Sequence, residues 1–303
     1  MKTPTRHSLN AALLGAAMIV AAPLQAQDAG TQEPENEDIV VEGTIDVDRA
    51  DTRDQTRDIT QRVTSTMAPL ARFQKPICAG IWGLSEENAQ IVIDRIYYNA
   101  EQVGVPIDET AECKANVWVI FVDDPQETFA QLRDNDDFMV RGLPYWDRER
   151  VEEQEGAALS WNITSIRTRG GAEAGDIELS GPVYETTQMS RTTTAVREDI
   201  EFSVVLFRRS ELANVDALTV ADYATMRALA KTEEPNESLA FDTILGAFGP
   251  ARDVTRLSVF DRSYLRALYR SSPTRNARFA LTEVESLMEE ELARMEAEGS
   301  QQR

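Results

Sequence analysis

Two apolar runs separated by one helical pattern dominate the first part of the predicted folded chain. Residues 76–82 and 115–122 are rich in apolar, β-branched and aromatic side chains, which predicts two strands, the second buried on both faces. Between them, Ser85 precedes Glu86 and Glu87, a good N-cap followed by acidic residues in the first turn. Apolar side chains then recur at helical spacing at Ile91, Val92, Ile96, Tyr97 and Ala100. This strand–helix–strand order predicts a right-handed crossover and a parallel strand pair.

The later patterns alternate between strands and helices and become helical toward the C-terminus. They predict a short helix over 125–134, strands over 158–166 and 200–207, and helices over 219–230, 239–248 and 260–269. Thr219 is the expected N-cap of its helix, with Asp222 as the acidic residue of a variant capping box. We therefore expect an α+β fold: a mixed sheet with a strand–helix–strand crossover and a helical C-terminal third.

The last predicted helix, over residues 275–298, is amphipathic. Its other face is strongly acidic, and its apolar stripe comprises Leu281, Val284, Leu287, Met288, Leu292 and Met295. The stripe has two interpretations: it docks on the core of the protein itself, or it binds a partner. The chain is thus divided into a signal peptide (1–26), an acidic flexible linker (27–66), a single α+β domain (67–274) and an acidic amphipathic C-terminal helix (275–303).

The N-terminus has the layout of a secretory signal peptide. Lys2 and Arg6 precede an uncharged, mostly apolar run over 11–24, and the small residue Ala26 follows at the expected cleavage edge. The run is too short for a comfortable transmembrane helix, which needs about 20 apolar residues, although an uncleaved anchor is the alternative. The sequence therefore predicts a protein of the periplasm, or a secreted one, cleaved near Ala26 and without a transmembrane segment after cleavage.

The linker is expected to be flexible because it has too little apolar surface to offset the entropy of ordering. Arg49, Arg53 and Arg57 recur every four residues among its acids, so part of it is compatible with a solvated helix.

Net charge restricts the partners. The chain has 31 basic and 52 acidic residues, and removal of residues 1–26 takes away two basic and no acidic ones, which leaves a net charge of −23. Such a surface repels nucleic acid and anionic membrane, so we expect no binding to nucleic acid.

The histidine content excludes several kinds of active site. The one histidine of the chain, His7, lies in the predicted signal peptide. A Ser-His-Asp triad, a Cys-His pair and a H-E-x-x-H zinc site are therefore absent from the cleaved chain. An enzyme would have to use carboxylates, Tyr, Ser, Thr, Arg or one of Lys75, Lys114 and Lys231. The acidic clusters at 123–124 and 134–137 lack the spacing of an EF-hand, so the sequence predicts no catalytic residue, metal ligand or cofactor.

Cysteine usage predicts a disulfide. Cys78 and Cys113 are the two cysteines of the chain, and in an oxidising compartment such a pair forms one bond. Closing a loop of this length stabilises the fold by about 3–4 kcal/mol in the loop-entropy treatment. The alternative is a pair of free thiols, one of them nucleophilic.

Two segments carry a family resemblance. Residues 221–229 (Ala-Asp-Tyr-Ala-Thr-Met-Arg-Ala-Leu) and 257–269 (Leu-Ser-Val-Phe-Asp-Arg-Ser-Tyr-Leu-Arg-Ala-Leu-Tyr) resemble an uncharacterised family of secreted bacterial proteins that has no established activity. More distantly, the order of elements resembles the metzincin metallopeptidase scaffold, whose late helix begins Leu-Thr/Ser-x-x-Asp and ends in Leu-Tyr. That pattern is present at Leu257, Ser258, Asp261, Leu268 and Tyr269.

The metal-binding half of the metzincin pattern is absent. The helix over 219–230 has neither the zinc-binding histidines nor the catalytic glutamate, so the resemblance implies a degenerate relative without the metal. It would place Asp222, Tyr223 and Met226 along the former metal cleft. The alternative is that Asp222 only caps its helix.

These observations favour a non-catalytic periplasmic binding or interaction protein, with another envelope protein as its partner. The alternatives are a carboxylate-dependent hydrolase and a zinc-free relative of a metallopeptidase. With 52 acidic residues, the sequence singles out no catalytic carboxylate pair.

Overall fold

We analysed a computed structural model of the chain. It describes residues 47–61, 68–110, 112–173, 175–177, 181–183, 190–236, 239–249 and 253–301. The predicted signal peptide and residues 27–46 of the predicted linker lie outside these ranges. The described residues belong to one compact unit, Asp46–Arg303.

A five-stranded mixed sheet is built around one long strand, β7 (Val196–Arg208). β4 (Ala158–Thr168) pairs antiparallel along one edge of β7. β1 (Arg72–Phe73) and β3 (Val117–Val122) pair with it in parallel along the other edge, and β2 (Ala79–Trp82) lies outside β3. β5 (Gly175–Ile177) and β6 (Gly181–Val183) form a separate antiparallel ribbon. The predicted mixed sheet is confirmed.

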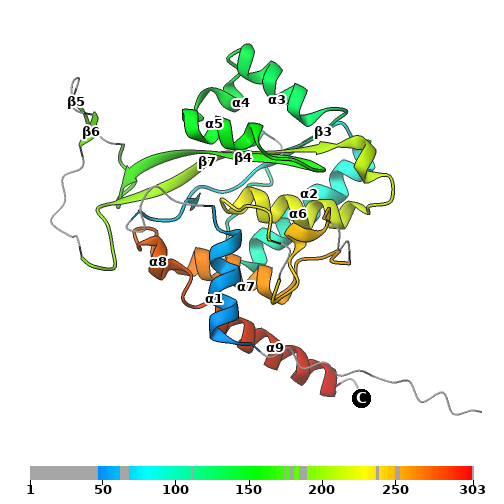
Figure 1. Ribbon diagram of the computed structural model, residues 1–303, viewed down its shortest axis with the longest axis vertical. Coiled ribbons are helices and arrows are strands. Elements are labelled where there is room, and N and C mark those ends of the chain that lie inside the picture. Colours follow the sequence, from blue (N-terminus) through cyan, green and yellow to red (C-terminus); the bar gives the residue numbers. More distant parts are fainter. Residues whose placement is uncertain are drawn as a thin grey trace, which may run out of the picture. The chain divides into compact units, whose positions relative to one another are not determined.

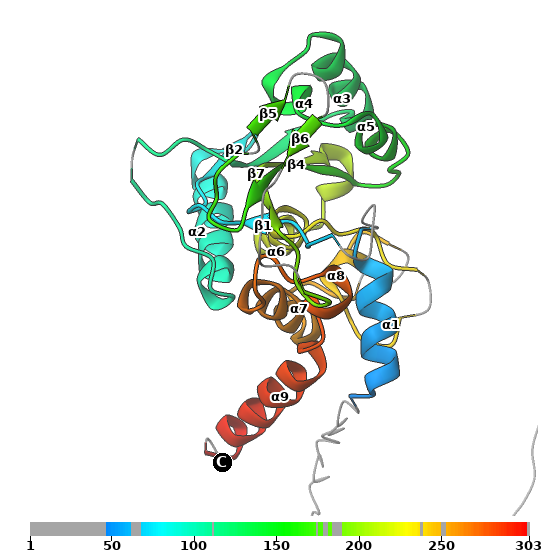
Figure 2. The ribbon, with the colours of Figure 1, turned by 90° about the vertical axis from the view of Figure 1, so that its left-hand side faces the viewer.

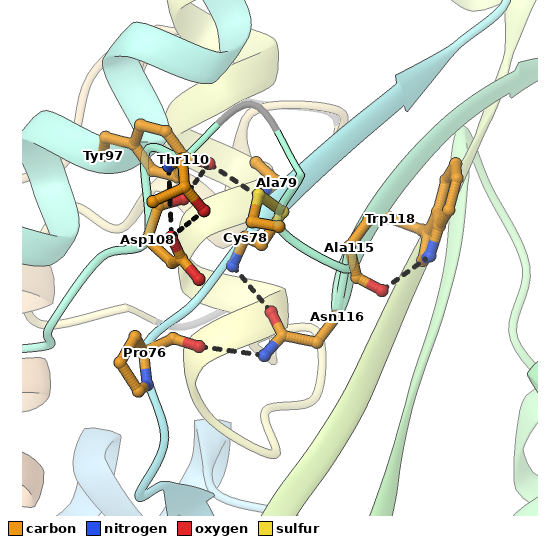
Figure 3. The surroundings of a disulfide bond; sticks show 10 residues. Pro76, Cys78, Ala79, Tyr97, Asp108, Thr110, Ala115, Asn116 and Trp118 are labelled. Carbon is orange, nitrogen blue, oxygen red and sulfur yellow. Dashed lines mark hydrogen bonds between the residues drawn. A yellow bond between two sulfur atoms is a disulfide. The ribbon is translucent and has the colours of Figure 1, made fainter.

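The predicted crossover unit is β2, α2 (Glu86–Gln102) and β3, and its strands are parallel. Ser85 is the N-cap of α2, as expected. Cys78 and Cys113 form the predicted disulfide, with 6.1 Å between their Cα atoms. Beside it, the Asn116 side chain accepts from the Cys78 amide at 2.8 Å and donates to the Pro76 carbonyl at 3.0 Å (Figure 3). The disulfide and this amide together hold the start of β2 against the entry to β3.

Helices cover both faces of the sheet (Figure 1). One face carries α3 (Pro125–Asp134), α4 (Phe138–Arg141) and α5 (Tyr145–Glu152). The other carries α2, α6 (Ala217–Leu229) and α7 (Val259–Arg270). β3 is buried on both faces, as predicted: Val117, Val119 and Phe121 point into the larger core and Ile120 into the smaller one. The sequence did not predict α4 and α5, which lie in a stretch that was read as polar although half of their residues are apolar. The acidic residues there cap helices, since Asp124 is the N-cap of α3 and Asp137 that of α4.

Two predicted helices need correction. α6 begins at Ala217 with Asp216 as its N-cap, so Thr219 is not the cap and Asp222 lies inside the helix. Residues 239–248 form no helix beyond the short 3₁₀ turn η2 (Ile244–Gly246). The buried Asp261 accepts from the Thr243 hydroxyl and the Ile244 amide, at 2.6 and 2.8 Å. These contacts tie the segment to the start of α7 and take up the Ile244 amide, which a helix over 239–248 would use. A second 3₁₀ turn, η1 (Arg209–Leu212), follows β7.

The C-terminal helix is divided into α8 (Ala277–Ala280) and α9 (Val284–Gln301). The first half of its apolar stripe docks on the core of the protein itself, because Val284, Leu287 and Met288 are all buried. Residues 293–300 are exposed, and the C-terminal end of α9 projects away from the other elements in both views (Figures 1 and 2).

Within the segment predicted to be a flexible linker, residues 49–59 form helix α1 (Arg49–Ile59). The linker prediction is wrong for these residues. Ile59 is fully buried, and the Gln55 side chain donates to the Phe241 carbonyl and accepts from its amide, each at 2.8 Å. A single apolar residue and one buried amide thus dock a helix that the arginine spacing allowed only as a solvated one.

Candidate functional site

A hollow of about 980 Å³ lies between α1 and the segment that includes α8 and the start of α9. We call it the α1 groove. Its floor and walls include Thr52, Thr56, Leu70, Ala277 and Leu281. In both views α1 runs beside these C-terminal elements (Figures 1 and 2).

Arginines dominate the charge of the α1 groove. Arg49, Arg53 and Arg57 follow one another at four-residue intervals along α1, and Arg278 comes from α8. Glu285 is the one carboxylate among the lining residues that the structure describes, and it accepts from Arg49 Nε at 2.8 Å. The contacts of Arg53 and Arg57 with Asp54 are longer, 3.6 Å each, and all these side chains are largely exposed. Solvent-exposed pairs of this kind hold side chains weakly, so both guanidinium groups are available to a ligand.

The position of α1 depends on contacts at its C-terminal end. The Gln61 amide donates to the Lys231 carbonyl at 3.0 Å, and the Glu233 amide donates to the Ile59 carbonyl at 2.8 Å. The hydroxyls of Thr60 and Tyr264 are hydrogen-bonded at 2.9 Å. The chain after α6 therefore holds the end of α1 against the α7 side of the core.

Thr56 contributes an unusual polar atom to the wall of the α1 groove. Its side chain is 7 % exposed, and its hydroxyl has no hydrogen-bond partner in the part of the chain that the structure describes. Buried hydroxyls without a partner are uncommon in folded proteins, and they are frequent where a ligand or water completes the site.

The α1 groove continues into two further hollows. A second one, of about 550 Å³, shares Thr60, Gln61 and Leu70 with it and reaches Pro144 and Trp146 at α5. A third, of about 470 Å³, lies between α5, β4 and the end of α6, and we call it the Arg227 hollow. It shares Gln61, Asp147, Arg150 and Lys231 with the second hollow. Gln61 thus lies where all three meet.

The predicted cleft residues lie elsewhere. Asp222, Tyr223 and Met226 are 0–1 % exposed and line none of the three hollows, so they do not form a cleft. The Asp222 carboxylate accepts from Arg95 Nε and Nη2 at 2.6 and 2.8 Å, from Asn99 at 2.7 Å and from the Leu257 amide at 3.0 Å. Both of its oxygens are engaged by protein groups, which identifies Asp222 as a structural residue rather than a helix cap or an acid catalyst.

The buried tyrosines are poorly suited to proton transfer. Burial raises the pKa of Tyr223 and that of Tyr264 to about 12 each. Both phenols stay protonated near neutral pH, so neither acts as a base there. Within the described ranges, no group of three or more His, Cys, Asp or Glu side chains is arranged to hold a metal ion.

The late-helix pattern that resembles metzincins has a local explanation in this structure. Ser258 and Asp261 form a capping box at the start of α7, in which each side chain accepts from the backbone amide of the other. Capping boxes are a general feature of helix starts, so the metzincin resemblance remains a prediction.

Comparison of the chain with protein-family models, with curated proteins and with solved structures finds no significant match. In the described part of the chain, no helix has the length and apolar character needed to cross a bilayer. The functional argument therefore rests on the geometry of the hollows. Sequence reasoning did not place Arg227, Lys231 or Arg278 in a site, although it named Lys231 among the side chains an enzyme could use and the four-residue spacing of the α1 arginines was visible.

Proposed function

We propose that this chain is an exported, non-catalytic protein whose α1 groove binds an acidic segment of another envelope protein. The observation that carries the proposal is the concentration of Arg49, Arg53, Arg57 and Arg278 around one hollow, with Glu285 as the single carboxylate among its described lining residues. The remainder of the surface is dominated by acids, since the whole chain has a net charge of −21.

This charge distribution favours one orientation of an acidic partner. Electrostatic interactions decay over about 8 Å at physiological ionic strength, so a bound anionic segment responds mainly to the groove and little to distant acids. Acids elsewhere on the surface repel the same segment and disfavour other orientations. The apolar floor at Leu70, Ala277 and Leu281 offers contact area between the arginines.

The direct test is fluorescence anisotropy with a labelled peptide of about ten glutamates, compared between wild type and the Arg53→Ala/Arg57→Ala double variant. Two exposed charge contacts are worth roughly 1–2 kcal/mol together, so the affinity should fall about tenfold. Both side chains are exposed and their contacts with Asp54 are long, so unfolding free energy should change by less than about 0.5 kcal/mol for each.

Arg133→Ala/Arg141→Ala is the matched control, because these arginines lie on α3 and α4, away from the groove, and pair with exposed acids. It should leave peptide affinity unchanged. Equal losses in the two double variants would show that only overall charge matters and would contradict the proposal. So would equally tight binding of a single-stranded oligonucleotide of the same charge.

Export has its own test. A signal peptide cleaved after Ala26 leaves Gln27 as the first residue, which the intact mass of protein isolated from the periplasm would reveal. The Cys78–Cys113 disulfide supports this assignment, since such bonds persist in oxidising compartments. Retention of residues 1–26 in the isolated protein would refute it.

A further inference from the structure

The Arg227 hollow contains a buried cation without a buried counter-charge. Arg227 lies in the last turn of α6 and is 4 % exposed. Its Nε donates to Ser160 Oγ at 2.5 Å, its Nη1 to the Thr232 carbonyl at 2.8 Å and its Nη2 to Gln154 Oε1 at 2.8 Å. All three acceptors are neutral, and among the described residues Arg227 forms no ion pair.

A guanidinium group keeps its charge inside folded proteins, so burial does not remove the charge. Its guanidinium has five N–H donors, of which these three hydrogen bonds use three. A buried charge without an opposite charge is costly, so folded proteins normally supply a carboxylate or a bound anion.

Arg72 is a second buried guanidinium whose hydrogen-bond acceptors are all neutral carbonyls, and its Nε has no partner among the described residues. It is 6 % exposed, and its Nη1 donates to the carbonyls of Leu268, Tyr269 and Ser271 at 2.5, 3.1 and 2.7 Å. These carbonyls lie at the C-terminal end of α7, where the helix dipole favours a cation. Arg72 lines none of the three hollows, whereas Arg227 borders a space of about 470 Å³.

The other cations of the Arg227 hollow are already paired. Arg150 Nη1 lies 2.6 Å from the Asp147 carboxylate, and Lys231 Nζ lies 3.5 Å from it. An incoming anion therefore finds Arg227 as the cation that has no direct ion pair among the described residues, although Glu234 of the same hollow interacts with it at longer range.

The other lining residues of the Arg227 hollow suit a ligand that also carries a positive charge and an apolar group. The acidic side chains Glu153, Glu155, Glu233 and Glu234 line the same hollow, and they make it unfavourable for a ligand with negative charge alone. Leu143, Val151 and Trp161 supply apolar wall.

We infer that the Arg227 hollow binds an amino-acid zwitterion with an apolar side chain. The carboxylate pairs with Arg227, the ammonium group faces the glutamates, and the side chain lies against the apolar wall. This site differs from the α1 groove in its ligand and shares only Gln61 with it among the lining residues, so either proposal can fail without the other.

The test uses L-leucine, L-methionine and L-phenylalanine as probes, with binding to the full cleaved chain measured by calorimetry and by intrinsic tryptophan fluorescence, to which Trp161 in the hollow wall contributes. L-leucinamide lacks the carboxylate and N-acetyl-L-leucine lacks the ammonium group. We expect leucine to bind, and each derivative to bind at least about tenfold more weakly, since one lost charge contact in a buried site is worth more than about 1.4 kcal/mol.

Two variants separate binding from folding. Arg227→Gln should abolish carboxylate-dependent binding, and its thermal unfolding shows whether the fold survives. Glu233→Gln/Glu234→Gln alters groups at least partly accessible to solvent and should weaken leucine binding several-fold, whereas N-acetyl-L-leucine, which has only a negative charge, should bind no more weakly than before.

No binding by any of the three amino acids up to about 10 mM would overturn the inference, because weaker affinity is not specific recognition. Equal affinity for leucine and leucinamide would also overturn it, since Arg227 would then make no contact with a carboxylate. Arg53→Ala/Arg57→Ala in the α1 groove should leave leucine binding unchanged.

Discussion

Helix α6 carries two buried charged side chains with opposite surroundings. Asp222 is fully buried and takes hydrogen bonds from Arg95, Asn99 and the Leu257 amide, all within 3.0 Å. Arg227, five residues later, is almost as deeply buried but has only neutral partners and borders a hollow. The first charge is neutralised inside the protein, and the second is not.

The partners of a buried charged side chain indicate whether it serves structure or binding more reliably than its residue type does. Both carboxylate oxygens of Asp222 already accept hydrogen bonds from the protein, so Asp222 is not available to a ligand. The resemblance to a metallopeptidase scaffold had nevertheless pointed to it. No sequence motif pointed to Arg227, yet its hydrogen bonds use only three of its five N–H donors and it lines a hollow. Completeness of hydrogen bonding is therefore the property that distinguishes the two.

The largest expected effect comes from removing the Asp222 carboxylate, whose hydrogen bonds are all made within the protein. Asp222→Ala leaves Arg95 and Asn99 without their shared acceptor and should lower the free energy of unfolding by about 3–5 kcal/mol, the usual cost of breaking a buried pair. Urea denaturation measures this loss. Asp94→Asn, on the exposed face of α2, is the control and should cost less than about 0.5 kcal/mol. A loss below about 1 kcal/mol for Asp222→Ala would show that the pair contributes little.

Removing the disulfide tests whether the crossover unit stabilises the contacts that Arg95 and Asn99 make with Asp222. Cys78→Ser/Cys113→Ser should cost about 3–4 kcal/mol, because it removes the constraint on the unfolded loop. α2, which supplies Arg95 and Asn99, lies inside that loop. Combining the serine changes with Asp222→Ala in a double-mutant cycle measures any coupling. An interaction energy of zero would mean that the disulfide stabilises the chain independently of the α6 contact.

Arg227→Gln should cost less than Asp222→Ala, about 1–2 kcal/mol. The variant loses hydrogen bonds to Ser160, Thr232 and Gln154 but also removes a buried charge that has no counter-ion in the described chain. Urea denaturation in the absence of amino acids gives the number. If Arg227→Gln costs as much as Asp222→Ala, Arg227 is as much a structural residue as Asp222, and the contrast between them fails.

Local patterns predicted the crossover unit well. Ser85 begins α2, and 117–122 forms a strand buried on both faces, because the periodicity of β2, α2 and β3 is complete within about 45 residues of chain. The N-cap of α6 was misplaced because Asp216 and Thr219, three residues apart, both suit the position. The docking of helix α1 was missed because it depends on Gln55 and the distant Phe241, which no local pattern encodes, although the arginine spacing was compatible with a solvated helix.

The candidate site was largely invisible for the same reason. Arg227 meets Ser160 and Gln154, which are 67 and 73 positions away in the chain, so its lack of a counter-charge emerges only from the folded structure. The α1 arginines were visible at four-residue spacing, but their role depends on the approach of α8, which supplies Arg278. Sequence reasoning therefore predicted the scaffold and the row of α1 arginines. It could not predict the surfaces that form where distant segments meet.

Glu201 tests the same idea at a partly exposed carboxylate. It too has a full set of hydrogen-bond partners, but its exposure makes the expected effect on stability the smallest of the four. Lys75 Nζ, Ser165 Oγ and Arg167 Nη2 donate to it at 2.7, 2.6 and 2.6 Å. Partial burial raises the pKa of Glu201, but these hydrogen bonds outweigh it and lower the pKa to about 2.

A pKa lowered in the folded state gives stability that is present above the unfolded value, near 4.5, and is lost as the pH falls toward about 2. The difference in unfolding free energy between wild type and Glu201→Gln should therefore be constant from pH 7 to 5 and shrink between pH 4.5 and 2. Chemical denaturation at each pH measures it, and the subtraction reduces the influence of neighbouring Asp199, whose own pKa is raised by burial. Glu173→Gln, which alters a side chain 78 % exposed beside the same Arg167, should show only a small difference at every pH. A difference for Glu201→Gln that stayed flat down to pH 2 would mean that its partners do not favour the ionised carboxylate, and a complete set of hydrogen bonds would then be a poor guide to which charges in this protein are already satisfied.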